Sequence, residues 1–442
     1  MRILIISDHA SPLSLLGGVD SGGQNVYVGK IAAELARRGH HVDIATRRDD
    51  PTLPTVVPIA PGARVIHVPA GPARFVRKEA LLAYMEEFSS YCSALCDFVS
   101  YDLIHANFFM SGRVGLRLKE RHKIPLVTTF HALGKVRRLH QGKVDGFPDE
   151  RVVIEEQLVQ LADTIIAECP QDREDLETLY GGKSARIRVI PCGYDPDEMG
   201  QVPRESARGR IGVEPTPFVV LQLGRIVRRK GIDTVIEGFS RFYHDSQANT
   251  RLLIVGGARD EGCKEEAREL KRLRRIVEIN QVSELVRFVG PRDRDELKYY
   301  YSAADVFVST PWYEPFGITP VEAMACGTAV IGSRVGGIKS TVLDGQTGFL
   351  IPPQDPEALT GRLHLLYRDA DLRQRLGDRG RERAASDYTW RSIGKAIDEL
   401  YREIVAGHRI KQPKFVERRL AIPSPHSQLP QRLGAQPGKD SR

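Results

Sequence analysis

This chain of 442 residues lacks a long apolar run and a recognisable signal peptide. No apolar stretch reaches the roughly 18 residues that a membrane-spanning helix requires. The opening MRILIIS is too short for a signal peptide and predicts a β-strand instead. These absences argue against a protein that spans a membrane.

Cysteine is scarce, and no two of the six cysteines form a C-x-x-C pair. Cys92 and Cys96 lie one helical turn apart, in a predicted helix that also carries Leu95 and Phe98. We interpret both as core residues rather than as metal ligands or a disulfide. Unpaired thiols fit a reducing compartment, so we expect a cytoplasmic protein.

Most of the chain has no large excess of positive over negative charge. The formal net charge is +7, but residues 409–442 hold eight Lys or Arg and two acids, so this tail carries +6. The body is therefore close to neutral, and we expect no nucleic-acid partner. Five prolines and no periodicity predict a disordered tail, which could touch anionic lipid weakly.

Strands and helices alternate along the rest of the chain, which is long enough for two domains. A strand at Arg2–Ser7, a Gly-rich loop, a helix at about Gln24–Arg38 and a strand at His41–Thr46 make the first βαβ unit. Ligands bind at the carboxyl ends of such parallel strands. The loop lacks the G-x-G-x-x-G spacing, so we predict no nicotinamide site.

The second half centres on residues 306–337, VFVSTPWYEPFGITPVEAMACGTAVIGSRVGG. A strand leads through a loop to a short helix, in which Thr319 is the predicted N-cap, Pro320 the first residue and Glu322 the partner in a capping box. A helix N-terminus facing the loop is a site for anions. Glu314 has no capping role, and a carboxylate there would suit sugar hydroxyls. Glu322 could instead only cap its own helix.

The segments EPFGITPVE and AMACGTAVIGSRVGG resemble the donor-sugar motif of the retaining glycosyltransferases of family 4, and the resemblance covers roughly residues 1–408. It implies an α/β fold of the GT-B type, with two Rossmann-like doubly wound parallel-sheet domains facing a cleft. It also implies that Glu314 binds the sugar hydroxyls and Glu322 the ribose. The neighbouring residues that it places against the donor are Phe316, Gly317 and Ile318.

Two basic residues of the second half resemble the family's pair that binds the donor pyrophosphate. Gly224 and Arg225 follow a strand predicted at Phe218–Leu223, and Lys230 comes five residues after Arg225. The alternative is a solvated loop, but flanking glycines directly after a strand favour a binding function.

The D-x-D sequence at residues 293–295 has the form of a metal site in other glycosyltransferases. Here it directly precedes a predicted helix, so we interpret Asp293 or Asp295 as its N-cap. We therefore expect no metal and no other cofactor.

In the first half, DSGGQNVYV combines two subgroup patterns. Its first part looks like the D-x-G-G-Q stretch of sucrose and sucrose-phosphate synthases, and NVYV looks like the inositol-phosphate N-acetylglucosaminyltransferase of mycothiol synthesis. Gly22 and Gly23 would let backbone approach the donor, unless they form only an ordinary turn. Asn25 is a candidate acceptor contact. His131 resembles the histidine that positions the donor sugar in sucrose-phosphate synthases; the alternative is a histidine that only ends its strand.

Lys78, Lys135 and Arg151 are three basic residues that a sheet could bring together. Three cations suit a phosphate on the acceptor. The resemblance implies that matching positions bind inositol phosphate, or the phosphate of fructose 6-phosphate nearby. Each of the three alone is more often a solvated surface charge.

We expect an acceptor-binding domain at residues 1–200 and a nucleotide-sugar-binding domain at 211–389, with the linker in the Pro-, Gly- and charge-rich segment 196–210. By resemblance, residues 390–408 form a helix that crosses back onto the first domain.

The resemblance implies a hexosyltransferase that uses a nucleotide sugar, with a UDP-sugar expected, and a phosphorylated sugar or polyol as acceptor. The expected catalytic residues are His131, Glu314, Arg225 and Lys230. Arg225, Lys230 and the helix N-terminus would stabilise the departing diphosphate. Its oxygen could take the acceptor's proton, so no general-base carboxylate is required.

Three alternatives remain open. A phosphorylase or epimerase could have the same fold, and a phosphorylase would need a lysine-bound pyridoxal cofactor. A non-catalytic binding protein should have lost Glu314, Arg225 or Lys230, yet all three are present. A lipid or glycan acceptor at a membrane surface is the third. The sequence leaves the acceptor, the donor sugar and the oligomeric state open.

Overall fold

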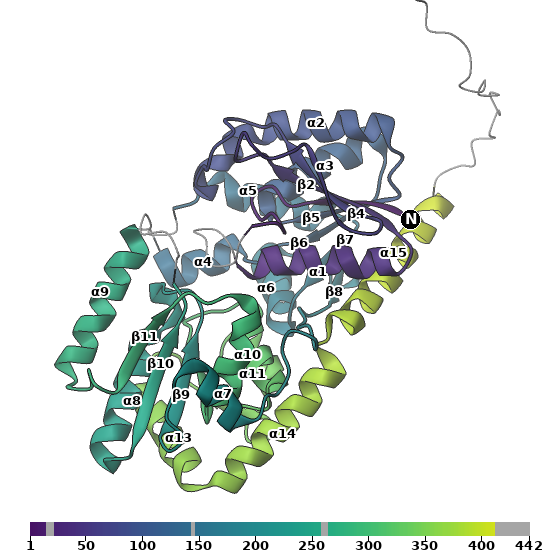
Figure 1. Ribbon diagram of the computed structural model, residues 1–442. Helices are drawn as coiled ribbons and strands as arrows, with labels where there is room; N and C mark the ends of the chain where they lie inside the picture. Colours follow the sequence, from purple (N-terminus) through teal and green to yellow (C-terminus); the bar gives the residue numbers. More distant parts are fainter. Residues whose placement is uncertain (15–21, 143–145, 258–263, 412–442) are drawn as a thin grey trace, which may run out of the picture.

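The computed structural model contains two α/β domains, each built around a parallel or mostly parallel sheet (Figure 1). It describes residues 1–14, 22–142, 146–257 and 264–411. The expected pair of Rossmann-like domains facing a cleft is confirmed, because the two sheets are separate and a cavity lies between them.

The first domain has an eight-stranded sheet among the described residues, in the order β3-β4-β2-β1-β5-β6-β7-β8. Every neighbouring pair is parallel except β3 and β4. The strands are β1 (Arg2–Ile6), β2 (His41–Arg47), β3 (Val56–Ala60), β4 (Ala63–Val68), β5 (Leu103–Asn107), β6 (Leu126–Thr129), β7 (Thr164–Ala167) and β8 (Ile187–Val189). The helices are α1 (Gly23–Arg37), η1 (Lys78–Tyr84), α2 (Met85–Phe98), α3 (Phe109–His122), α4 (Gly134–Gln141), α5 (Glu150–Leu161), α6 (Pro170–Tyr180) and η3 (Ser184–Arg186), where η marks a 3-10 helix.

The second domain has a six-stranded, fully parallel sheet in the described part of the chain, in the order β11-β10-β9-β12-β13-β14. The strands are β9 (Phe218–Leu223), β10 (Thr250–Val255), β11 (Val286–Gly290), β12 (Val306–Ser309), β13 (Ala329–Ser333) and β14 (Gly348–Ile351). The helices are α7 (Arg204–Ile211), η4 (Arg228–Lys230), α8 (Ile232–Ser246), α9 (Lys264–Ile279), α10 (Arg294–Ala303), α11 (Ile318–Ala325), α12 (Ile338–Thr341), α13 (Pro356–Arg368), α14 (Ala370–Asp387) and α15 (Trp390–Lys411).

The central strands are continuous apolar runs, which explains why the sequence predicts them well. Ile3, Leu4 and Ile5 of β1 are each at most 1% exposed. Helices cover both faces of a parallel sheet, so its strands do not alternate between apolar and polar residues.

Strand order reverses in both sheets beside the first strand, between β1 and β5 and between β9 and β12. Loops that leave the carboxyl ends of the strands diverge at such a point and leave room for a ligand. The polar residues expected at the site follow these strands or their neighbours.

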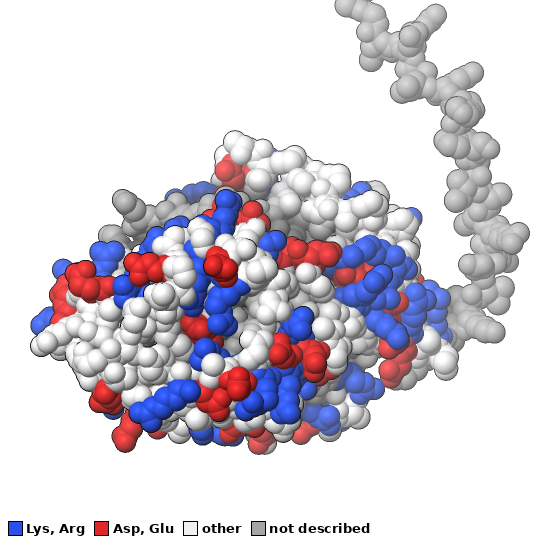
Figure 2. Space-filling model, turned by 60° about the horizontal axis from the view of Figure 1, so that its bottom comes forward, with Lys and Arg blue, Asp and Glu red and all other residues white. Residues whose placement is uncertain are grey.

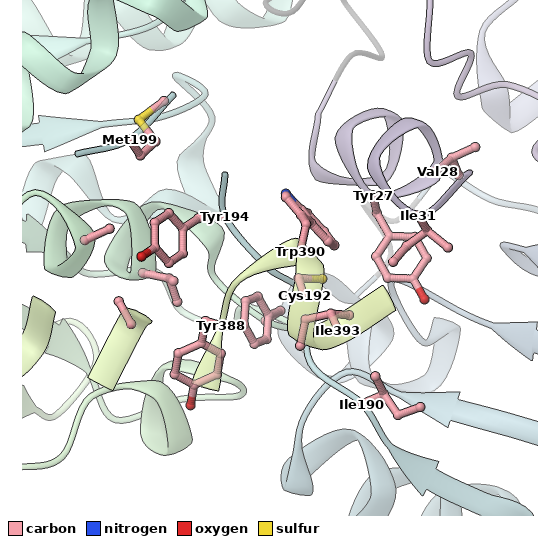
Figure 3. Close-up of a cluster of buried hydrophobic side chains, with 14 of the residues drawn as sticks. Tyr27, Val28, Ile31, Ile190, Cys192, Tyr194, Met199, Tyr388, Trp390 and Ile393 are labelled. Atoms are coloured by element: carbon pink, nitrogen blue, oxygen red, sulfur yellow. The ribbon is translucent and has the colours of Figure 1, made fainter. Parts of the chain in front are cut away.

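The chain crosses between the domains twice, and the two crossings lie side by side. The Tyr194 amide donates to the Tyr388 carbonyl at 2.7 Å, and the Trp390 amide donates to the Tyr194 carbonyl at 3.0 Å. Figure 3 shows the buried cluster around this point, in which Trp390 lies between Tyr27 of α1 and Tyr194. Trp390 and Tyr27 are 2% and 1% exposed. The two domains therefore share one continuous apolar core here.

Helix α15 runs from the second domain past α1 to the first domain (Figure 1). Its Tyr401 hydroxyl lies 2.6 Å from Nδ1 of His105, and its Asp398 carboxylate lies 2.7 Å from Nε2 of His40. The crossing-back helix thus has the expected course, although it continues to Lys411 rather than ending at 408. The expected tail beyond Lys411 lies outside the described residues.

Some elements differ from the expectations. The segment 196–210, expected as a linker, contains the start of α7, which the sequence hides because RESARGRI has little apolar periodicity. Tertiary contacts hold this helix on the second domain: Arg208 pairs with Asp305 at 2.7 Å. Strand β3 and helices α3 and α4 were not predicted either.

No helix in the described ranges is long and apolar enough to cross a membrane. Figure 2 shows basic and acidic side chains interspersed over the face that it presents. This mixture agrees with a body whose formal charge is close to zero.

Candidate active site

A cavity of about 390 Å³ lies where the two domains meet, and residues from both line it. All ten residues expected to bind the donor are in this lining: Gly22, Gly23, Gly224, Arg225, Lys230, Glu314, Phe316, Gly317, Ile318 and Glu322. His131, Asn25 and Lys78 also line it, whereas Lys135 and Arg151 do not. One interdomain space thus holds most of the chemistry that the sequence singles out.

The N-termini of two helices meet in this cavity. Helix α1 begins at Gly23 and α11 at Ile318, and a Cβ added to Gly23 would lie 3.3 Å from Cδ1 of Ile318. The first amides of a helix have no partner inside the helix and carry partial positive charge. The two helix ends could therefore bind an anionic group between them.

The predicted capping box at Thr319 is wrong. The N-cap of α11 is Gly317, with φ of 87°, so Thr319 and Pro320 are already the second and third helical residues. Glycine enters this left-handed conformation without the steric cost that a side chain brings, which lets the helix begin two residues early. No side chain caps this end, so its amides can bind a ligand.

Glu314 is held by two cations from the loop after β9. Its Oε2 forms an ion pair with Lys230 and lies 3.4 Å from Nη1 of Arg229. Burial acts to raise the pKa of Glu314, but the charges of Lys230 and Arg229 outweigh it and hold the pKa below its ordinary value. The carboxylate is thus ionised and fixed in the cavity wall.

Gly231 explains how this loop approaches the end of β12 so closely. Its φ is 62°, and a Cβ would stand 2.0 Å from the carbonyl oxygen of Thr310. The two loops are also bonded directly, because the Trp312 amide donates to the Arg229 carbonyl at 2.9 Å. Only glycine permits this contact, which places Lys230 against Glu314.

Glu322 pairs with Arg294 rather than capping its own helix. Nη1 of Arg294 lies 2.9 Å from Oε1 of Glu322, and the Tyr301 hydroxyl donates to Oε2 at 2.9 Å. Arg294 also pairs with Glu198 in the crossing segment. Asp293 is the N-cap of α10, as expected, and its amide donates a hydrogen bond to the Glu296 carboxylate.

His131 lies at the end of β6 with both ring nitrogens engaged. Nδ1 is 2.9 Å from Oε1 of Glu168, and Nε2 is 2.9 Å from Oδ1 of Asn107. The thiol of Cys192 donates to the same Glu168 oxygen at 3.0 Å. His131 has a φ of 57°, which is uncommon for a residue with a side chain.

The structure does not bring the three expected acceptor cations together. Lys78 lines the cavity, but the ammonium of Lys135 lies 2.7 Å from Glu156 and 4.7 Å from the Tyr180 ring centroid. Arg151 is 1% exposed, pairs with Glu155 at 2.8 Å and stacks on Phe147. Arg151 therefore acts as a buried structural charge in this conformation.

Several lining residues were missed by sequence reasoning: Arg137, Glu168, Arg229 and Arg294. Glu168 directly follows β7 at the carboxyl edge of the sheet, which was the available signal. Arg294 was visible only as the middle of the D-x-D sequence. Its pairing with Glu322 joins residues from two different helices, which no local pattern predicts.

Residues 21–198 match the model of the family described as Glycosyltransferase Family 4, and residues 203–383 match that of Glycosyl transferases group 1. A D-inositol 3-phosphate glycosyltransferase of Corynebacterium jeikeium is 36% identical over 417 residues, which cover 92% of this chain and 98% of the relative. A second D-inositol 3-phosphate glycosyltransferase, from Catenulispora acidiphila, is 35% identical over 425 residues and covers 92% and 98%.

Among solved structures, a sucrose-phosphate synthase from Thermosynechococcus elongatus superimposes with a TM-score of 0.86 at 34% identity, covering 92% of this chain and 99% of that one. Anabaena Alr3699/HepE in complex with UDP-glucose has the same fold, with a TM-score of 0.71 at 20% identity and coverage of 91% and 100%.

Proposed function

Because this chain belongs to glycosyltransferase family 4, with its GT-B fold, we propose that it moves a hexosyl group from a UDP-sugar to a hydroxyl of a phosphorylated sugar or polyol, with retention of anomeric configuration. Support for the phosphorylated acceptor comes from two relatives of similar identity: one is named for inositol 3-phosphate and the other for sucrose phosphate.

The observation that carries the proposal is the placement of Glu314 between cations and a helix N-terminus. Glu314 pairs with Lys230, and Arg225 and the amide end of α11 line the same cavity. A nucleotide sugar needs this combination, because its sugar offers hydroxyl donors to a carboxylate while its diphosphate needs positive charge.

In the proposed reaction, the bond between the anomeric carbon and the diphosphate oxygen breaks, and the acceptor oxygen bonds to that carbon. The acceptor's proton goes to the departing phosphate oxygen. Lys230, Arg225 and the α11 amides stabilise the charge that grows on the diphosphate. A preorganised donor of this kind contributes about 100- to 1000-fold in rate.

Glu322 would bind the ribose of the donor, and Arg294 and Tyr301 hold its carboxylate in a fixed orientation. A carboxylate accepts hydrogen bonds from two neighbouring hydroxyls at once, so it suits a ribose edge. His131 lies on the first-domain wall of the cavity, where it would position the donor sugar.

Lys78 would bind the phosphate of the acceptor, and Arg137 is a second cation in the cavity wall. Asn25 is a further candidate for the acceptor, and its Oδ1 accepts a hydrogen bond from the Gly22 amide at 2.9 Å. Lys135 and Arg151 would act only by supporting this wall.

The proposal includes no metal or other cofactor, because basic side chains and helix amides already supply positive charge for the diphosphate. Turnover should therefore survive EDTA.

The decisive experiment measures nucleotide release from UDP-glucose, UDP-N-acetylglucosamine, GDP-mannose and ADP-glucose. Each donor is combined with fructose 6-phosphate, inositol phosphate, their unphosphorylated counterparts or no acceptor. Release from a UDP-sugar that requires one phosphorylated acceptor is expected. Release only with unphosphorylated acceptors would contradict the acceptor assignment, and no release with any pair would contradict the proposed reaction.

A further inference from the structure

Glu168 is a carboxylate in the cavity wall that the reaction described above does not use. It directly follows β7, is 3% exposed and lines the cavity. The neighbouring Cys169 thiol donates to the Pro315 carbonyl at 3.2 Å, so Glu168 lies near the loop that carries Glu314. A second carboxylate so close to the sugar site requires a compensating charge.

The hydrogen bonds around His131 identify that charge. Glu168 can only accept from Nδ1 when ionised, so Nδ1 carries a proton. On the other side, Nδ2 of Asn107 faces the carbonyl oxygens of Ile6 at 3.5 Å and His105 at 3.4 Å. This orientation turns Oδ1 of Asn107 toward Nε2, which then also has to donate. A ring that donates from both nitrogens is an imidazolium.

His105, the nearest buried histidine, shows the opposite arrangement. Its ring nitrogens face the hydroxyls of Thr129 at 2.8 Å and Tyr401 at 2.6 Å, which can donate as well as accept. Burial, helped by the charge of His131, lowers the pKa of His105 to about 3. The two neighbouring histidines thus differ in their partners: a carboxylate and an amide oxygen face His131, whereas two hydroxyls face His105.

The residues that contact or neighbour the His131 ring come from helix α1 and from strands β5 and β7. Helix α1 contributes Tyr27, whose ring centroid is 4.9 Å away at an interplanar angle of 73°. Strand β5 contributes Asn107 and neutral His105, and the end of β7 contributes Glu168. Burial acts to raise the pKa of Glu168, but His131 outweighs it and holds that pKa below the ordinary value.

The two ring contacts also secure an unusual backbone. A φ of 57° is uncommon at a residue with a side chain and persists only when neighbouring contacts enforce it. The bonds from Glu168 and Asn107 fix the ring from opposite sides and so supply that constraint.

We propose that Glu168, together with Asn107, holds His131 as an imidazolium in one fixed orientation in the cavity wall, which makes Glu168 a positioning residue for glycosyl transfer. The consequence for transfer rests on the function proposed above. A fixed, charged His131 would orient the sugar, while the nucleotide contacts of the second domain remain untouched.

The first test reads the charge of His131 directly and needs no substrate. Protein labelled with ¹⁵N-histidine is compared with Glu168→Gln by NMR at pH 7.5, where a histidine with the ordinary pKa of about 6.5 is about nine-tenths neutral. His131→Asn assigns the signal. Two protonated ring nitrogens are expected in the wild type and one in Glu168→Gln. A neutral wild-type ring, or an unchanged ring in the variant, would overturn the proposal.

Asp398→Asn is a matched control, because Asp398 also pairs with a buried histidine, His40, at 2.7 Å but lies outside the cavity lining. It removes the same kind of charge and should leave the His131 signals as in the wild type. Thermal unfolding of both variants separates a loss of stability from a change at His131.

The second test compares turnover with nucleotide affinity. Carboxylates that orient histidines at metal sites contribute about 10- to 100-fold, and we expect a loss in kcat of that size for Glu168→Gln. The Kd for UDP should stay within about twofold. A loss of UDP affinity as large as the loss in kcat, or an unchanged kcat, would contradict a positioning role. If the wild type turns over no donor and acceptor pair, the proposed function fails, while the NMR result still decides the state of His131.

Discussion

The two walls of the cavity are built in different ways. The second-domain wall comes mainly from two short loops, after β9 and β12, which are bonded to each other through Thr310, Trp312, Arg229 and Gly231. The first-domain wall collects single side chains that follow the ends of several strands, such as Phe108, His131 and Glu168. The first arrangement suits a donor that must always be held in the same way. The second allows individual positions to change with the acceptor.

Lys230→Ala tests the second-domain wall and should have the largest effect. Loss of this cation removes charge stabilisation from the diphosphate and leaves Glu314 with only Arg229, so we expect kcat to fall at least about 100-fold. The measurement is initial rate with saturating donor and acceptor. Arg228→Ala is the control, since Arg228 stacks at 6.0 Å over Trp312 and is outside the lining. Near wild-type turnover of Lys230→Ala would contradict the diphosphate assignment.

Lys78→Ala against Lys135→Ala tests the first-domain wall. Lys78 lines the cavity, whereas Lys135 pairs with Glu156. Only Lys78→Ala should therefore weaken binding of the acceptor's phosphate group. A lost hydrogen bond to a charged group of about 1.5–3 kcal/mol predicts a KM for the phosphorylated acceptor raised about tenfold or more. Donor KM should not change. A larger effect from Lys135→Ala would contradict the assignment of the acceptor phosphate to Lys78.

Acid stability gives the smallest expected effect and involves both walls. The pKa values of Glu314 and Glu168 lie below the ordinary value of 4.5 in the folded protein. Each therefore contributes stability that is present above about pH 4.5 and is lost as pH falls through the lower, folded value. Thermal unfolding between pH 7 and pH 3.5 should show this decline, and Glu314→Gln or Glu168→Gln should make it shallower. A decline unchanged in both variants would contradict the ionised state of these carboxylates.

The same contrast explains what could be predicted from the sequence. Glu314, Gly317 and Glu322 stand in one contiguous stretch, and Arg225 and Lys230 in another, so their grouping was visible before the fold was known. Pairs such as His131 with Glu168 join the ends of different strands. Nothing local marks them, because the sheet order alone brings β6 beside β7.

Two other differences between expectation and structure have physical causes of other kinds. Thr319 looked like a helix cap, but Gly317 takes a left-handed conformation that composition does not reveal, and the helix starts earlier. Arg151 looked like a phosphate ligand, but a guanidinium can also be buried when a carboxylate and aromatic faces surround it. Sequence patterns identified the types of residue, and tertiary packing decided how each is used.

The paired crossings at Tyr194 and Trp390 have a mechanical consequence. Both polypeptide crossings meet at one point, so the two domains are joined by a single short hinge rather than by a long flexible linker. Gly193 is packed so tightly that an added Cβ would lie 2.9 Å from the Trp390 ring, which leaves little play at the hinge itself. A small rotation of one domain about this hinge would produce a larger displacement far from it. The distance between Gly23 and Ile318, on opposite walls of the cavity, would therefore report how far the cavity is open.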